Sequence, residues 1–174
     1  MYGTAKFKLH PKDADAVTDN ITGPISRNQL RHALSQFPTG VTVITCALDS
    51  GPLGMTANSF NSVSLDPPLV LWSIMKTASR YAHFTAAQRF SIHVLHHDQA
   101  DLCSGFAKNG KYFDHVDWHY NDSGVPVLDR CLARFDCEQY ALHDAGDHSI
   151  IVGRVTQFVQ GLGRPLIFSQ GTFL

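Results

Sequence analysis

Residues 51–74 read GPLGMTANSFNSVSLDPPLVLWSI and pass from a glycine-rich start, through small polar residues, into an almost continuous apolar run. The apolar part extends over 67–75, PPLVLWSIM, and the preceding segment GVTVITCAL at 40–48 has a similar composition. Unbroken apolar runs rich in valine, isoleucine and threonine are typical of strands covered on both faces. We therefore expect two buried strands, and the two prolines fix where the second can begin.

The stretch between these two strands predicts a turn and then a polar loop. Gly51, Pro52 and Gly54 are turn residues, so the two strands could pair as neighbours. Residues 56–64 follow with a dense series of hydroxyl and amide side chains. Such a segment either binds a flat polar ligand through free backbone groups and small side chains, or is a loop capped by its own Asx and Ser/Thr turns. Composition alone favours the capped loop.

The rest of the chain predicts short helices and further strands. Helical spacing of apolar residues indicates helices at 26–37, 79–88 and 99–107, with Ser26 and Asp98 as N-caps of the first and third. Strand patterns occupy 89–95, 131–142, 149–160 and 166–173, and 108–130 reads as a long surface loop. Strands and helices do not alternate regularly, so the pattern predicts a mainly β, antiparallel barrel or sandwich with helices at its ends.

Length and composition indicate one cytoplasmic domain. The 174 residues are 44% hydrophobic, which suffices for one core, whereas residues 1–25 are polar and aperiodic and predict a flexible arm before a domain at 26–174. A net charge of −1 excludes a strong field for nucleic acid or an anionic membrane. No segment has the apolar length of a secretory signal or a membrane span. The cysteines lie in apolar stretches and are expected to be reduced and buried: Cys46, Cys103, Cys131 and Cys137.

Two further segments carry side chains suited to chemistry. MKTASRY at 75–81 places Lys76, Thr77, Ser79 and Arg80 where a strand gives way to a helix, which is either an anion site or an ordinary helix start with solvated charges. HDAGDHSI at 143–150 sets His148 at the start of a strand. There the imidazole faces a cleft under the influence of Asp147 or Asp144, or is simply structural.

Neither a metal site nor a familiar nucleotide loop is indicated. The ten histidines include His93, His96 and His97 and the pair His115 and His119, but alternation turns His93 away from its neighbours and the pair lies in a predicted loop. We therefore expect no metal. The chain also lacks the G-x-G-x-x-G and P-loop patterns, so a nucleotide site must be built in another way.

Seven segments of the chain form one pattern: FPTGVTVIT, GMTANSFNSVSLDPPLVLWSI, FSIHVL, GFAKNGKYFDHVDW, VPVLD, AGDHSIIVGRV and GRPLIFSQGTF. In this order and spacing they resemble the small flavin reductases that serve two-component flavin-dependent monooxygenases. The resemblance covers roughly 31–173, and its most specific parts are the first half of the quoted stretch and AGDH. It implies an FMN-binding split barrel, a Greek-key barrel with peripheral helices, and a homodimer with flavin sites near the interface.

The resemblance also implies a reaction and the residues that serve it. Hydride would pass from NADH or NADPH to FMN or FAD, and the reduced flavin would diffuse to a partner oxygenase. His148 is expected beside the nicotinamide, with the C-terminal GRPLIFSQG closing the site nearby. The family varies at positions 76 and 77. The residues expected to bind the flavin are Thr56, Ala57, Asn58, Ser59, Ser73, Lys76, Thr77, Ser79, Phe106 and Ala107.

Two alternatives remain open at this point. One is a flavin-binding protein of the same fold without reductase activity, and the other is a dimeric module that binds metal through its histidines. No residue in the sequence distinguishes FMN from FAD or NADH from NADPH.

Overall fold

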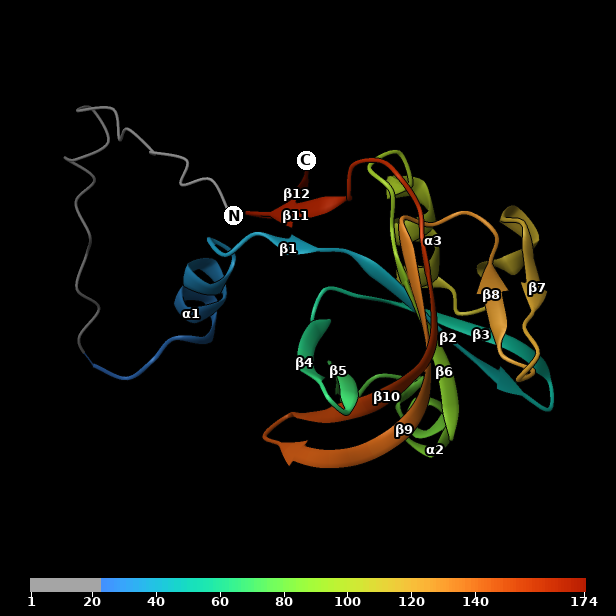
Figure 1. The fold of residues 1–174 in the computed structure, drawn as a ribbon. Helices are drawn as coiled ribbons and strands as arrows, with labels where there is room; N and C mark the ends of the chain where they lie inside the picture. The colour runs from blue at the N-terminus through green and yellow to red at the C-terminus, as the bar shows by residue number, and fades with distance from the viewer. Residues whose placement is uncertain (1–22) are drawn as a thin grey trace.

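A computed structural model describes residues 23–174, so the predicted arm at 1–25 lies almost wholly outside the described residues. A seven-stranded antiparallel sheet dominates the fold, in the order β3-β2-β6-β9-β10-β5-β4 (Figure 1). This confirms the mainly β, antiparallel prediction. The strands are β2 (Thr42–Leu48), β3 (Gly51–Ala57), β4 (Asn61–Leu65), β5 (Pro68–Met75), β6 (Arg89–Val94), β9 (Ala133–Ala145) and β10 (His148–Gln160).

The sheet is strongly curved and carries short helices at its margins. Strands β9 and β10 form a long hairpin that bends beneath the rest of the sheet, and edge strand β3 contacts β5 across the curve (Figure 1). Helix α1 stands apart from the curved sheet, as Figure 1 shows, and none of its residues is buried. All three predicted helices are confirmed: α1 (Arg27–Leu34), α2 (Tyr81–Ala86) and α3 (Ala100–Lys108).

Local composition misled the prediction in the opening stretch. Residues 51–57 are a strand rather than a turn, because β2 pairs with all of β3, from Leu48 opposite Gly51 to Thr42 opposite Ala57. Part of the predicted loop at 56–64 is also strand, since β4 pairs with β5. The predicted pairing of the two apolar strands is wrong as well: β2 lies between β3 and β6, whereas β5 lies between β10 and β4.

Segment 108–130 is also more ordered than predicted. It holds a 3-10 turn at Tyr112–His115 and a hairpin of β7 (Trp118–Tyr120) with β8 (Pro126–Leu128). The buried residues of this small layer include Phe113 of the 3-10 turn and the consecutive residues 125–128 at β8. At the chain end the predicted single strand is a hairpin of β11 (Ile167–Ser169) and β12 (Thr172–Phe173), which pairs with β1 (Thr39–Gly40). Asp98 does not cap α3, because the N-cap residue is Gln99.

The main core lies inside the curve of the sheet. The Trp72 ring meets Phe84 of α2 and Phe90 of β6 edge to face, with ring centroids 5.3 Å and 6.2 Å apart. A second core lies under α3 and the β7–β8 hairpin and includes the fully buried Phe106. Three of the four free cysteines are buried as predicted and Cys131 is partly buried.

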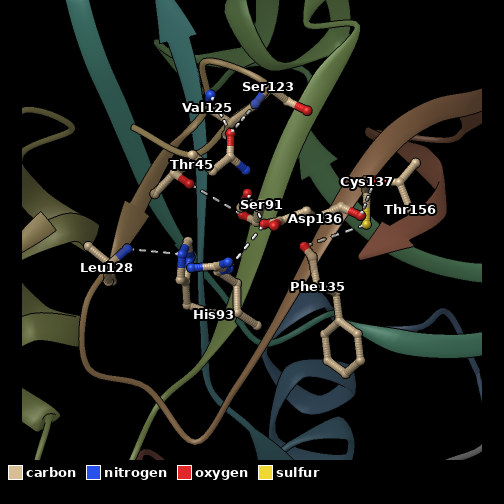
Figure 2. A network of polar contacts seen from close by, with 12 residues as sticks. Thr45, Ser91, His93, Ser123, Val125, Leu128, Phe135, Asp136, Cys137 and Thr156 are labelled. Atoms are coloured by element: carbon tan, nitrogen blue, oxygen red, sulfur yellow. Dashed lines mark hydrogen bonds and ion pairs between the residues drawn. The ribbon is translucent and has the colours of Figure 1, made fainter. Parts of the chain in front are cut away.

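A polar seam joins the main sheet to the β7–β8 hairpin (Figure 2). The fully buried His93 lies in this seam: its Nδ1–H donates to the Val43 carbonyl at 3.0 Å, and its Nε2 accepts from the Leu128 N–H at 3.1 Å. Thr45 Oγ1 donates to the Pro126 carbonyl at 2.6 Å. Burial lowers the pKa of His93 from 6.5 to about 4, so the ring is neutral and serves as a structural link.

Candidate functional site

Strands β5 and β10 present one buried and one half-exposed face. Alternation turns Trp72 and Ile74 of β5 into the core, so Ser73 lies on the other face. In the antiparallel register Ser73 stands opposite Ile150, and Met75 stands opposite His148. Opposed residues share a face, so Ser73 and His148 stand on the same half-exposed surface. The sequence predicted that β5 would be covered on both faces; the prediction is wrong for the face that carries Ser73.

The register also joins two segments that are far apart in the sequence. The Lys76 backbone N–H donates to the Asp147 carbonyl at 3.0 Å, directly after the Met75–His148 pair. Lys76 Nζ donates to the Gly146 carbonyl at 2.7 Å and forms an ion pair with Asp144. Gly146 occupies a left-handed conformation, φ 67°, which glycine adopts without strain in this tight corner. The MKTASRY and AGDH motifs therefore form one corner of the molecule.

His148 begins β10 with its side chain about one third exposed. Its Nδ1 contacts Asp147 Oδ1 at 2.7 Å, and this contact holds the pKa of the Asp147 carboxyl below its usual value. Of the two carboxylates considered from the sequence, Asp147 is therefore the partner, because Asp144 pairs with Lys76 instead. With Nδ1 directed to a carboxylate, Nε2 is the ring nitrogen left to meet a ligand.

The small polar residues of the opening stretch lie next to this face. Ser59 Oγ donates to the Ser73 carbonyl at 3.0 Å and accepts from the Ser73 N–H at 2.9 Å, which fastens the end of β3 to β5. Thr56 Oγ1 donates to the Cys103 carbonyl of α3 at 2.6 Å. Residues 56–59 thus form a wall beside this face; the hydroxyls of Thr56 and Ser59 shape it, while Asn58 is exposed.

A cavity of about 260 Å³ opens beside this wall, and the sequence did not predict all of its lining. Two aromatic residues of the C-terminal hairpin, Phe168 and Phe173, close one side, with their rings 5.5 Å apart. The two aromatic residues can be seen near the end of the sequence, but only the pairing of β11 with β1 brings them to the cavity. The predicted residues that line the cavity are Thr56, Ala57 and Asn58.

The other predicted residues lie around the start of α2 and the end of α3. Thr77 and Ser79 are exposed in the turn before α2. Phe106 is fully buried, with Tyr112 and Phe113 against its ring, so its side chain faces the core rather than a ligand. Ala107 is exposed one residue later. Arg80, considered as part of an anion site, instead directs its guanidinium to backbone carbonyls.

The histidines give limited support for a metal site. His96, His97 and Asp98 place ligand atoms within 4.8 Å of one another, but Asp98 already binds Arg130 at 2.6 Å and His96 at 2.8 Å. His93 is used by the backbone contacts of the polar seam. His119 pairs with Asp129 at 2.5 Å, away from His115.

Comparison with known proteins identifies the family of this chain. The model of the flavin reductase like domain matches residues 34–174. The chain belongs to this family. The resemblance drawn from the sequence is therefore confirmed, and the structural relatives of this flavin reductase-like chain are split barrels.

Individual relatives differ in their sequence identity to this chain and in the share of each protein that is covered. FMN reductase (NADH) SmoA of Agrobacterium fabrum is 53% identical over 153 residues, 88% of each protein. The reductase component of the trigonelline monooxygenase of Acinetobacter baylyi is 45% identical over 78% of this chain, which spans only 46% of that protein. The structure of Streptomyces globisporus NADH:FAD oxidoreductase SgcE6 with NAD and FAD fragments matches with a TM-score of 0.83 at 38% identity, covering 88% of this chain and 94% of that one.

Among residues 23–174, every helix is too short or too polar to cross a membrane.

Proposed function

We propose that this chain is an NAD(P)H-dependent flavin reductase that reduces FMN or FAD and supplies the reduced flavin to a partner monooxygenase. The observation that carries the proposal is the register of β5 with β10. It sets Ser73 and His148 on one half-exposed face, beside the corner that joins Lys76 to Asp147. The names of the relatives, which include an NADH-dependent FMN reductase and a monooxygenase reductase component, support the same activity.

The residues around this face fit a flavin. Small side chains at Ala57 and Ser59 leave room for a flat ring, and the 260 Å³ cavity begins beside them. Exposed hydroxyls at Thr77 and Ser79 suit the ribityl phosphate end. The flavin-binding set in this proposal is Thr56, Ala57, Asn58, Ser59, Ser73, Lys76, Thr77, Ser79, the backbone of Phe106, and Ala107.

A flavin held by these residues would supply the redox chemistry, as the acceptor of hydride from the reduced nicotinamide. The protein contributes by holding the two rings in contact and excluding water, which converts a collision into a reaction between positioned partners. His148 orients the nicotinamide through Nε2, because the Asp147 carboxylate engages Nδ1. No residue of the chain needs to form a covalent bond with either substrate.

The proposal is tested by assaying NADH and NADPH oxidation with FMN, FAD and riboflavin in turn. We expect turnover with at least one pair, and the pair with the highest kcat/KM identifies the preferred cofactors. A protein that is isolated with bound flavin but oxidises neither nucleotide would be a flavin-binding protein and would contradict the proposal. Lack of both flavin binding and turnover would contradict it equally.

We further propose that residues 26–174 form the folded domain and that it works as a homodimer in the cytoplasm. The large apolar side chains of α1 and its flanks are 47–76% exposed, which favours cover by a second subunit: Ile25, Leu30, Leu34 and Phe37. The free cysteines are consistent with a reducing compartment. Light scattering coupled to size-exclusion chromatography tests the dimer, and a monomeric mass at micromolar concentration would contradict it.

A further inference from the structure

Arg80 immediately precedes α2 and reaches across the molecule to two other segments. Its Nη1 donates to the Gly54 carbonyl of β3 at 2.8 Å and to the Phe106 carbonyl of α3 at 2.6 Å. Its Nη2 donates to the Ala107 carbonyl at 2.8 Å. One guanidinium thus binds three backbone carbonyls from a strand and a helix that are far apart in the sequence.

These acceptors are the kind that a cation stabilises well. Phe106 and Ala107 lie in the last turn of α3, where the carbonyls have no partners within the helix. The helix dipole also gives this C-terminal end a partial negative charge. The planar fork of arginine can donate several hydrogen bonds at once, which a lysine ammonium cannot do with the same geometry. Arg80 therefore closes the C-terminal end of α3 and fastens it to β3.

The joint between β3 and α3 is closely packed around this contact. The Gly54 N–H donates to the Gly110 carbonyl at 2.8 Å, so both backbone polar groups of Gly54 are bonded in this joint. A Cβ atom at Gly54 would lie 2.5 Å from the Phe106 ring, so the strand and the helix can approach this closely only with glycine there. Two residues further along β3, Thr56 binds the Cys103 carbonyl of the same helix.

We propose that Arg80 is a positioning residue for the flavin site. Arg80 holds the turn at 76–79, the wall at 56–59 and the end of α3 in one fixed arrangement. The inference rests on the proposed function, because these three segments are the proposed flavin-binding ones. Arg80 acts through the backbone of Gly54, Phe106 and Ala107. Its guanidinium is not an anion ligand, since its Nη atoms are directed to carbonyls.

Flavin affinity of Arg80 variants, measured by the quenching of flavin fluorescence on titration with protein, tests this inference. We expect Arg80→Ala to raise the flavin dissociation constant at least tenfold, since one hydrogen bond to a charged donor corresponds to roughly this factor. Arg80→Lys should lie between Ala and the wild type, and millimolar guanidinium should restore part of the affinity of Arg80→Ala. Arg89→Gln is the matched control, because Arg89 is an exposed arginine whose ion pair within residues 23–174 is with Glu138, and this variant should bind flavin normally.

Steady-state kinetics separate positioning from a general loss of structure. The KM for flavin should rise in Arg80→Ala and Arg80→Lys, whereas the KM for NADH and the kcat at saturating flavin should stay within about twofold of the wild type. An unchanged flavin dissociation constant in a folded Arg80→Ala protein would overturn the inference. It would also be overturned if Arg80→Lys and Arg80→Ala lowered kcat and raised both KM values together, in step with a fall in unfolding midpoint.

The two proposals fail in different ways. Turnover by the wild-type protein tests the proposed function, whereas the ratio of flavin dissociation constants between variant and wild type tests Arg80. A wild-type protein that binds flavin without oxidising NADH would refute the reductase but would leave that ratio measurable.

Discussion

His93 makes the stability of this protein depend on pH in a way that can be calculated. The ring is fully buried, and burial lowers its pKa from 6.5 to about 4. Protonation would add a proton to Nε2, which is the acceptor for the Leu128 N–H, and would place a charge near Arg134. The negative charge of Asp136 acts in the opposite direction and favours the protonated ring, but burial outweighs it.

The direction of the effect follows from which state binds the proton. Between pH 6.5 and about 4 the unfolded chain is protonated at His93 while the folded chain is not. The free energy of unfolding therefore falls as the pH is lowered through this range and is constant above it, as far as this group is concerned. At 1.36 kcal/mol for each pKa unit, the full loss amounts to about 3 kcal/mol.

Urea unfolding of the wild type and of His93→Gln, at fixed protein concentration and at several pH values from 4.5 to 7.5, measures this effect. Glutamine can still accept the Leu128 hydrogen bond but does not titrate, so its stability should vary less with pH. The free energy of unfolding of the wild type, minus that of His93→Gln, should fall by about 2 kcal/mol on acidification across this range. The exposed His83→Gln serves as control and should leave the wild-type slope unchanged. A difference that does not vary with pH would refute the reasoning.

Three further variants test the site. His148→Ala should raise the KM for NADH severalfold and leave the flavin dissociation constant within about twofold; equal changes in both, measured by kinetics and titration, would remove its assigned role. Gly54→Ala places a methyl group 2.5 Å from the Phe106 ring and should lower the free energy of unfolding by about 1–3 kcal/mol in urea titration, and unchanged stability would contradict the close packing. Thr56→Val removes the 2.6 Å bond to the Cys103 carbonyl and should weaken flavin binding by about threefold to tenfold in fluorescence titration, whereas tighter binding would argue against a wall role.

The strongest strands could be predicted from the sequence because their composition and their environment agree. β2 has four β-branched residues among seven and is buried at five successive positions. β3 and β4 were missed because glycine, proline and serine favour turns, and pairing with β2 and β5 overrides that local preference. The β7–β8 hairpin was missed for a different reason: its buried run at 125–128 is only four residues long, follows a segment rich in Asp, Asn and Gly, and is covered only where it meets the second core.

The site was predicted one segment at a time, and its assembly was not. Nothing local in MKTASRY or AGDH indicates that Lys76 meets Asp147, because that contact depends on the register of β5 with β10. The contacts of Arg80 could not be predicted either. Its acceptors are backbone carbonyls, which every residue type carries, so the sequence does not indicate them. The involvement of flavin came from the family resemblance, whereas the spacing of residues indicated only a polar surface beside a strand.

Anaerobic reduction of free flavin by NADH tests the central claim most directly. A catalytic amount of protein is added to FMN or FAD with excess NADH, and the bleaching of the flavin's visible absorbance is followed against a protein-free sample. We predict complete bleaching through many turnovers, slowed in His148→Ala at limiting NADH. Bleaching no faster than in the protein-free sample, with either flavin and with either NADH or NADPH, would contradict the account.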